Sequence, residues 1–145
     1  MLYFDTSILI PLVVPERASA EVHRFVRTQA ASGLATSHWT RVEGSSVLAR
    51  EVRMKHYLAS AALKVDGDLE SLIHDSFLIL TVKRDDLETA KLLLQKYETA
   101  LRAGDALHLA IARNNNAEAI YSLDDRMIRA GRLLGLPVSR GIRAK

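Results

Sequence analysis

The chain has 145 residues, of which 48% are hydrophobic and 26% are charged, which is ordinary for a globular domain with a sizeable core. It contains no cysteine, so disulfides, thiolate metal ligands and cysteine nucleophiles are excluded. The net charge of +3 is too small to indicate a nucleic-acid partner by itself.

The first half of the chain alternates short apolar runs with longer amphipathic ones. Residues 1–4 predict a buried strand that ends at Asp5, and residues 8–14 stay apolar as far as Pro15. The hydrophobic spacing predicts helices over residues 19–30, 40–54 and 57–73. Residues 34–39 and 77–82 predict two further strands.

The second half continues this alternation. Residues 85–101 predict a helix with one apolar stripe, formed by Leu87, Ala90, Leu94, Tyr97 and Leu101. Residues 105–113 are apolar almost all round, which is typical of a buried helix. A strand over 119–123, a helix over 126–134 and a short strand over 136–139 complete the chain. This order predicts an α/β fold in one domain, residues 1–145, with a mostly parallel sheet covered on both faces.

Four acidic residues occupy places where such a fold puts its functional crevice. Asp5 and Asp124 each follow a predicted strand, and the crevice of an open parallel sheet lies beyond the carboxyl ends of its strands. Asp105 stands at the start of the buried helix, and Glu43 in the first turn of another. These side chains can therefore converge.

Each acid also has an ordinary structural explanation. Thr40 and Glu43 have the spacing of a capping box. Asp105 and Asp124 stand at helix starts, where caps and the helix dipole favour acids. Asp5 can accept hydrogen bonds from the amides of the turn that follows it.

Taken together, the four acids favour a metal site. Converging carboxylates raise one another's pKa unless a cation is present. Mg²⁺ takes oxygen ligands and binds through carboxylates together with substrate phosphate. The matching chemistry is phosphodiester hydrolysis by a metal-activated water, with either one or two ions.

Four segments carry a resemblance that spans essentially the whole chain. They are residues 3–9 (YFDTSIL), 40–43 (TRVE), 101–110 (LRAGDALHLA) and 121–124 (YSLD). Together they resemble the PIN-domain ribonucleases, specifically the toxin half of VapBC-type toxin–antitoxin pairs. The third segment is the most specific of the four.

The resemblance implies a three-layer α/β/α sandwich and an endoribonuclease that uses Mg²⁺ or Mn²⁺. It also implies a small antitoxin partner, a homodimer and an RNA substrate. The implied catalytic residues and metal ligands are Asp5, Glu43, Asp105 and Asp124. The candidates to support them are the hydroxyls of Thr6, Ser7 and Ser122, with Asp125 as a candidate to share the role of Asp124.

Several other residues have two interpretations. A lone histidine in an apolar helix, His108, is more often a core residue than a ligand. Trp39 fits the core or an interface better than base stacking. Arg41 and Arg102 flank site acids, where they either bind phosphate or pair with a carboxylate. The segment from 126 to 145 carries no acid and six cations, which are Arg126, Arg129, Arg132, Arg140, Arg143 and Lys145. This segment is either a solvated basic tail or a surface that contacts RNA, with Arg126, Arg129 and the C-terminal arginines as the leading candidates.

Two rival functions stay open. An inactive PIN-fold module would bind RNA or protein without cleavage, although the presence of all four acids favours an enzyme. A haloacid-dehalogenase-like phosphohydrolase would need a second aspartate at the position of Ser7. The apolar N-terminus has no basic leader, and no apolar run approaches the ~18 residues of a membrane span. We therefore expect a cytoplasmic protein whose RNA target and antitoxin the sequence does not identify.

Overall fold

A computed structural model describes residues 1–142. Strands and helices alternate along the chain, as the sequence predicts. The strands are β1 (Leu2–Phe4), β2 (Leu34–Ser37), β3 (Leu78–Leu80), β4 (Ala119–Tyr121) and β5 (Val138–Ser139). The α-helices are α1 (Thr6–Val13), α2 (Ser19–Arg27), α3 (His38–Arg53), α4 (Ala59–Ser76), α5 (Arg84–Leu94), α6 (Ala103–Asn114) and α7 (Asp125–Leu133). Two short 3₁₀ helices are η1 (Ala31–Gly33) and η2 (Tyr97–Thr99).

The five strands form one sheet in the order β3-β2-β1-β4-β5. Every pairing among the described strands is parallel, with Tyr3 opposite Ala35 on one side and Ile120 on the other. The chain builds outward from β1 in one direction and then returns to the other side of β1 for β4 and β5. The order therefore reverses between β1 and β4, and such a switch point is where open parallel sheets bind ligands.

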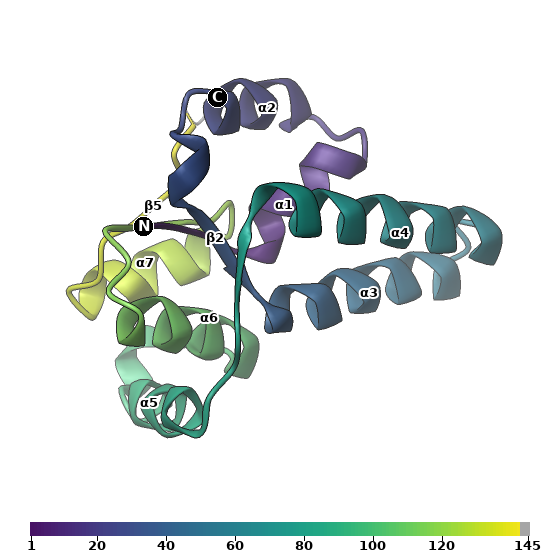
Figure 1. Ribbon diagram of the computed structural model, residues 1–145. Coiled ribbons are helices and arrows are strands. Elements are labelled where there is room, and N and C mark those ends of the chain that lie inside the picture. Colours follow the sequence, from purple (N-terminus) through teal and green to yellow (C-terminus); the bar gives the residue numbers. More distant parts are fainter. Residues whose placement is uncertain (143–145) are drawn as a thin grey trace.

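Two hydrophobic clusters cover the two faces of the sheet. Tyr3 belongs to the cluster formed with α5, α6 and α7, whereas the next residue, Phe4, belongs to the cluster formed with α1, α2 and α4. Ile120 and Tyr121 divide in the same way, because successive strand side chains point to opposite faces. In Figure 1, α3 and α4 run side by side and extend away from the sheet. The predicted three-layer α/β/α sandwich is confirmed.

Several element boundaries differ from the sequence prediction. The apolar run after Asp5 is helix α1, which its uniform hydrophobicity did not distinguish from a strand. The strand predicted over residues 34–39 ends at Ser37, and α3 begins at once with His38. The α3–α4 pair therefore starts earlier along the chain than predicted.

The long helix predicted over residues 85–101 is wrong in its second half. Helix α5 ends at Leu94, and the Thr99 hydroxyl donates to the carbonyl of Lys96 within the 3₁₀ turn that follows. Ala100 then takes a left-handed backbone conformation (φ 53°), which no α-helix continues through. Tyr97 is 84% exposed, so it is not part of the core.

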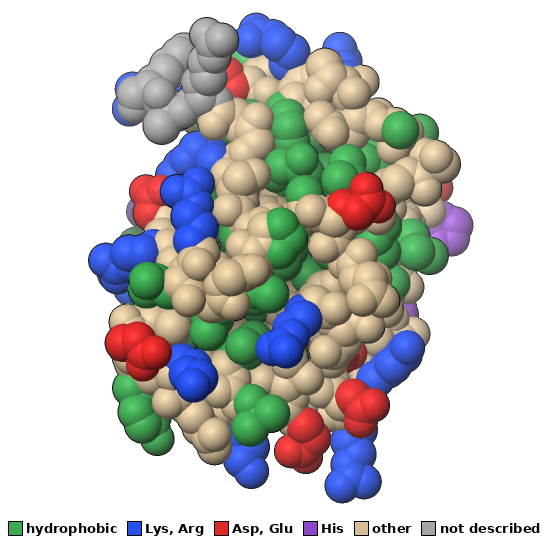
Figure 2. All heavy atoms as spheres, turned by 90° about the vertical axis from the view of Figure 1, so that its left-hand side faces the viewer, with side chains coloured by type: hydrophobic (Ala, Val, Ile, Leu, Met, Phe, Trp, Pro, Cys, Tyr) green, Lys and Arg blue, Asp and Glu red, His purple; other side chains and the backbone are tan. Residues whose placement is uncertain are grey.

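The basic surface is dispersed. Figure 2 shows cationic side chains scattered among acidic and apolar ones over the face that it draws. Arg126, Arg129 and Arg132 are exposed on α7, and Arg140 forms an ion pair with Asp125. Two of the predicted cations, Arg143 and Lys145, lie outside the described residues. No helix among residues 1–142 is long and apolar enough to cross a membrane.

Candidate functional site

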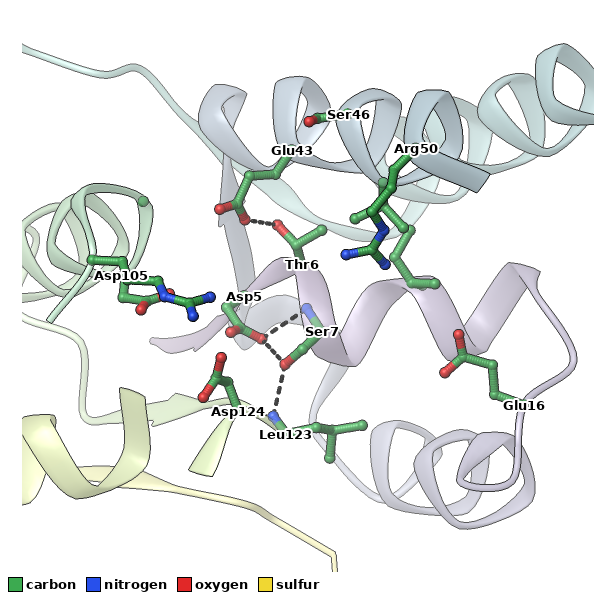
Figure 3. A pocket seen from close by; sticks show the side chains of 14 residues that line it. Asp5, Thr6, Ser7, Glu16, Glu43, Ser46, Arg50, Asp105, Leu123 and Asp124 are labelled. Carbon is green, nitrogen blue, oxygen red and sulfur yellow. Dashed lines mark hydrogen bonds between the residues drawn. The ribbon is translucent and has the colours of Figure 1, made fainter. Parts of the chain in front are cut away.

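A cleft of about 620 Å³ opens at the carboxyl edge of the sheet, at the switch point between β1 and β4. Its walls come from α1, α3, the start of α6 and the loop that joins β4 to α7. All four predicted acids line it: Asp5, Glu43, Asp105 and Asp124. Figure 3 shows Glu43 and Asp124 on either side of Asp5, with Asp105 reaching the same space from a separate helix.

Asp5 ends β1 and caps α1. Its Oδ1 accepts hydrogen bonds from the amides of Ser7 (3.1 Å) and Ile8 (3.3 Å) and from the Ser7 hydroxyl (2.6 Å). Its Oδ2 accepts from the Ser122 hydroxyl at 2.7 Å. Asp5 is only 5% exposed, and burial raises its pKa above the ordinary value, against the lowering effects of His108 and the two serines. The capping explanation and a place in the cleft therefore apply together.

Ser7 and Ser122 connect the ends of β1 and β4. The Leu123 amide donates to the Ser7 hydroxyl at 2.7 Å, and the Asp124 amide donates to the Ser122 hydroxyl at 3.0 Å. Each hydroxyl also donates to the Asp5 carboxylate. The two serines therefore fix the loop that carries Asp124 relative to Asp5.

Glu43 reaches the cleft from the second turn of α3. The helix begins at His38, so the predicted first-turn position of Glu43 and its capping box with Thr40 are wrong. The Thr40 hydroxyl instead bonds the hydroxyl of Thr36 at 2.7 Å, both side chains being buried. The Glu43 side chain is therefore free of a capping role.

The Glu43 carboxylate is held through one of its two oxygens. Oε2 accepts from the Thr6 hydroxyl at 2.5 Å and bonds His108 Nε2 at 2.8 Å. Burial raises the pKa of Glu43, but His108, Thr6 and the nearby Trp39 together hold it below the ordinary value. The Trp39 indole N–H is buried and forms no hydrogen bond with any described residue.

His108 is a core residue, as predicted, but it also contacts the site. It is 1% exposed in α6, and its Nδ1 lies 2.8 Å from the Tyr3 hydroxyl. That hydroxyl lies 2.9 Å from Ser37 Oγ. The sequence predicted that His108 belongs to the core and not to the site, whereas the buried His108 side chain also bonds a carboxylate of the cleft.

Asp105 is the third residue of α6 and is half-buried. It makes no hydrogen bond to another side chain among the described residues. Burial raises its pKa, and the negative charges of Asp124 and Glu43 raise it further. The charges of the neighbouring acids therefore act on the pKa of Asp105 in the predicted direction.

Asp124 is the N-cap of α7. Its Oδ1 accepts from the amides of Arg126 (2.7 Å) and Met127 (3.3 Å). The adjacent Asp125 points elsewhere: its side chain is 85% exposed and pairs with Arg140, outside the cleft. Of the two neighbouring acids, only Asp124 lines the cleft.

The donor set fits a hard divalent cation. The cleft offers carboxylate oxygens from four elements and no soft ligand, and Asp105 is not engaged by any other side chain. Among the described residues, however, no three acids or histidines are arranged to hold one ion at once. The hydrogen bonds to Asp5, Glu43 and Asp124 account for their present orientations, and like charges favour separation of the carboxylates until a cation neutralises them.

Sequence reasoning missed some of the residues that line the cleft. Arg50 projects from α3 and Glu16 lies in the α1–α2 loop, at the end of the cleft away from Asp105 (Figure 3). The position of Arg50, seven residues after Glu43 and so on the same helix face, was the available signal. Arg102, which was considered, lines the cleft, whereas Arg41 pairs with Glu70 instead.

Three solved structures share the fold. The first is VapC20 of Mycobacterium tuberculosis, described as a sarcin-ricin loop cleaving toxin, with a TM-score of 0.74 and 18% identity over 90% of this chain and 95% of that one. The second is FitAcB of Neisseria gonorrhoeae, with a TM-score of 0.69 and 16% identity over 97% and 98%. The third is VapBC-1 of nontypeable Haemophilus influenzae, with a TM-score of 0.68 and 14% identity over 97% and 98%.

These identities are low enough that the structural similarity establishes the fold alone, and no curated sequence matches the chain. The family model of the PIN domain matches residues 2–133, a segment that contains β1 to α7 and all four cleft acids. The chain therefore belongs to the PIN-domain family.

Proposed function

We propose that this protein, as one PIN-like domain, is the toxin of a type II toxin–antitoxin pair and acts as a divalent-metal-dependent endoribonuclease. One observation carries the proposal: four carboxylates from four separate elements line a single cleft at the switch point of the sheet. Membership of the PIN-domain family and the similarity to VapC20, whose description names it a toxin, support the same function.

The chain's residues divide the work. Asp5, Glu43, Asp105 and Asp124 would hold Mg²⁺ or Mn²⁺ through carboxylate oxygens. Such a cation would lower the pKa of a water molecule and neutralise charge on the phosphate that is attacked. Ser7 and Ser122 keep Asp5 oriented, as their hydrogen bonds in the cleft support.

The cleft also contains the means to bind RNA. Arg50 and Arg102 both line the cleft. Arg50 lies 3.3 Å from the carboxylate of Glu51, whereas Arg102 makes no ion pair among the described residues. Guanidinium groups bind phosphates in a forked, bidentate manner. These two arginines bind the phosphates on either side of the scissile bond and so draw the backbone past the acids.

The proposed partner is a small antitoxin, and the proposed state in the cytoplasm is a homodimer. Several similar structures are described as two-component assemblies, including VapBC-1 and a FitAB complex bound to a DNA fragment. By that likeness, the antitoxin covers the cleft and the pair binds DNA together.

The deciding experiment measures cleavage of a mixed RNA pool by the purified protein. We expect cleavage with Mg²⁺ or Mn²⁺, none with EDTA, and growth arrest when the protein is expressed without its antitoxin. Cleavage that persists in EDTA would contradict the metal mechanism. Metal binding without cleavage of any RNA, including the sarcin-ricin loop, would favour the inactive binding module instead.

A further inference from the structure

The two oxygens of Glu43 lie in different surroundings. Oε2 is bonded to the hydroxyl of Thr6 and to His108 Nε2. Oε1 is not part of that anchor: it faces the start of α6, where a Cβ on Gly104 would come within 2.6 Å of it, on the side of the Trp39 indole that helps to lower the pKa of this carboxylate. One oxygen is anchored and the other is left available.

The anchor extends into the core as a chain of buried hydrogen bonds. An ionised carboxylate only accepts, so the ring of His108 must donate to Glu43 from a protonated Nε2. The opposite nitrogen, Nδ1, bonds the hydroxyl of Tyr3, which in turn bonds the hydroxyl of Ser37. Both ring nitrogens are thereby satisfied, and the orientation of the imidazole is fixed from β1 and β2.

This arrangement is more than a way to fill the core. The neighbours of His108 in α6 are buried apolar residues, among them Leu109 and Ala112. Burying an imidazole there costs free energy unless each polar atom finds a partner, whereas an aliphatic side chain would need none. The polar chain from Ser37 ends on a cleft carboxylate, which is how proteins orient groups that bind metals.

Gly104 lies beside the second carboxylate oxygen of Glu43, Oε1. Its ideal Cβ position is also 3.7 Å from the indole nitrogen of Trp39, so a side chain there would fill the space between α3 and α6. A Cβ at 2.6 Å from Oε1 is too close, so the carboxylate at the end of the Glu43 side chain would have to shift. The absence of a side chain at position 104 therefore leaves room for Oε1 in its present position at the edge of the cleft.

We propose that His108, Tyr3 and Gly104 are positioning residues for Glu43, which they hold with Oε2 anchored and Oε1 presented to the cation. This inference rests on the proposed metal-dependent function. It assigns His108 no direct contact with metal or RNA. Its role is to limit the orientations open to the Glu43 carboxylate before the ion arrives, so that less ordering of this side chain opposes binding.

The first test measures the affinity for Mn²⁺ alone by titration calorimetry, without RNA. We expect His108→Leu to weaken binding by roughly tenfold to a hundredfold, as for other groups that orient metal ligands. Tyr3→Phe, which removes a single hydroxyl, should weaken binding several-fold. His108→Gln, whose amide nitrogen can replace Nε2, should restore most of the loss. A merely structural role would lower the melting temperature without this rescue of Mn²⁺ affinity.

A matched pair of glycine substitutions tests the other oxygen. Gly104→Ala should weaken Mn²⁺ binding at least as much as Tyr3→Phe. Gly67→Ala on α4, where a Cβ would meet nothing within 4 Å, should bind Mn²⁺ like the wild type. Equal affinities for the two variants would overturn the role of Gly104. Folded His108→Leu and Tyr3→Phe proteins that bind Mn²⁺ within twofold of the wild type would overturn the whole inference.

A metal-independent readout separates this inference from the proposed function. Nitrogen-15 NMR of the imidazoles should show a protonated Nε2 for His108, with the signal assigned by its loss in His108→Gln. The other four histidines are exposed, so the signal should also exchange most slowly with water. An unprotonated Nε2 would exclude the bond to Glu43. If the wild type shows the protonated Nε2 but binds no Mn²⁺, the proposed function fails while the contact stands.

Discussion

The two sides of the cleft hold their carboxylates in different ways. On the β1–α3 side, Asp5 accepts four hydrogen bonds and Glu43 accepts two, all from the protein. On the side formed by the starts of α6 and α7, Asp105 has no side-chain partner and Asp124 accepts only the two cap amides. The carboxylates of Asp5 and Glu43 are therefore fixed by hydrogen bonds, whereas Asp105 and Asp124 have carboxylate oxygens that no other side chain among the described residues bonds.

This difference indicates that one side of the cleft orients its carboxylates, while the other side mainly contributes negative charge. The carboxylates of Asp5 and Glu43 are already held by hydrogen bonds, so fewer side chains on that side remain to be ordered when an ion binds. On the open side, burial raises the pKa of Asp105, and the negative charges of Asp124 on the same side and Glu43 across the cleft raise it further. We expect the oriented carboxylates of Asp5 and Glu43 to determine where a cation binds. The charge of that cation should then reduce the repulsion among Asp105, Asp124 and Glu43.

The largest expected effect comes from removing one carboxylate on each side. Asp5→Asn and Asp105→Asn should each lower RNA cleavage at least about a hundredfold, since a loss of ~3 kcal/mol in transition-state stabilisation has that effect. The substitutions are nearly isosteric, and each removes one negative charge from the cleft. Initial rates on the same RNA at saturating Mn²⁺ provide the measurement.

Its control is circular dichroism of both variants, which should match the wild type. If either variant retains more than a tenth of the wild-type rate while folded, its side of the cleft is not needed for cleavage. The comparison between the two sides would then lose its functional meaning.

The next largest effect is expected on RNA binding in the cleft. Arg50→Gln and Arg102→Gln should each weaken RNA binding several-fold and lower the dependence of log affinity on log salt by roughly 0.7, the contribution of one phosphate on a single strand. Fluorescence anisotropy with Ca²⁺ in place of Mg²⁺ measures binding without the need for turnover.

The matched control neutralises three exposed arginines on α7 that lie away from the cleft: Arg126, Arg129 and Arg132. The sequence made Arg126, Arg129 and the C-terminal arginines the leading candidates for RNA contacts, whereas the proposed function assigns that role to Arg50 and Arg102, which line the cleft. A larger loss of RNA affinity in the α7 triple variant than in Arg50→Gln and Arg102→Gln would show that RNA binds mainly to α7 and not to the cleft.

A smaller effect is expected on stability without metal. The raised pKa of Asp105 means that the folded protein binds its proton more tightly than the unfolded chain does. Below its ordinary pKa, the Asp105 carboxyl does not lower the free energy of unfolding. As the pH rises through the raised pKa, the carboxyl ionises in the folded protein and the free energy of unfolding falls. Asp105→Asn should therefore raise the melting temperature at pH 7 in EDTA by a few degrees at most, because solvent screens a half-exposed charge.

That gain should become much smaller when the melting experiment is repeated near pH 3.5, where the carboxyl is mostly protonated in both states. Added Mn²⁺ should reverse the order at pH 7, since the ion stabilises only the folded protein that binds it well. An equal gain at both pH values would show that the effect comes from packing and not from charge.

The sequence predicted the layers and the cleft acids for identifiable physical reasons. Alternation of short apolar runs with amphipathic ones defines a parallel sheet, and Asp5 and Asp124 follow strands whose carboxyl ends share one edge. The order of strands was not available, since it depends on crossovers that leave no periodic signal. The ends of α3 and α5 were misplaced because the start at His38 has no side-chain cap and Tyr97 continues the helical spacing without being buried.

The chain of contacts behind Glu43 was beyond local reasoning. Tyr3, Ser37 and His108 belong to three elements that are distant in sequence, and their hydrogen bonds exist only once the sheet is assembled. In the sequence, His108 has the features of a core residue, and the structure agrees that it is buried. Its second role depends on Glu43 lying in the second turn of α3, which the predicted helix start had misplaced.

The smallest expected effect distinguishes two adjacent acids. Asp125→Asn should leave RNA cleavage within about twofold of the wild-type rate, because surface charges of this kind contribute little. Its side chain is exposed and paired with Arg140 outside the cleft. Asp124→Asn should instead lose most cleavage while keeping α7 intact, since the asparagine oxygen can still accept from the amides of Arg126 and Met127. Equal losses in both variants would show that the two acids share the role, and that the open side of the cleft extends further along α7 than its lining indicates.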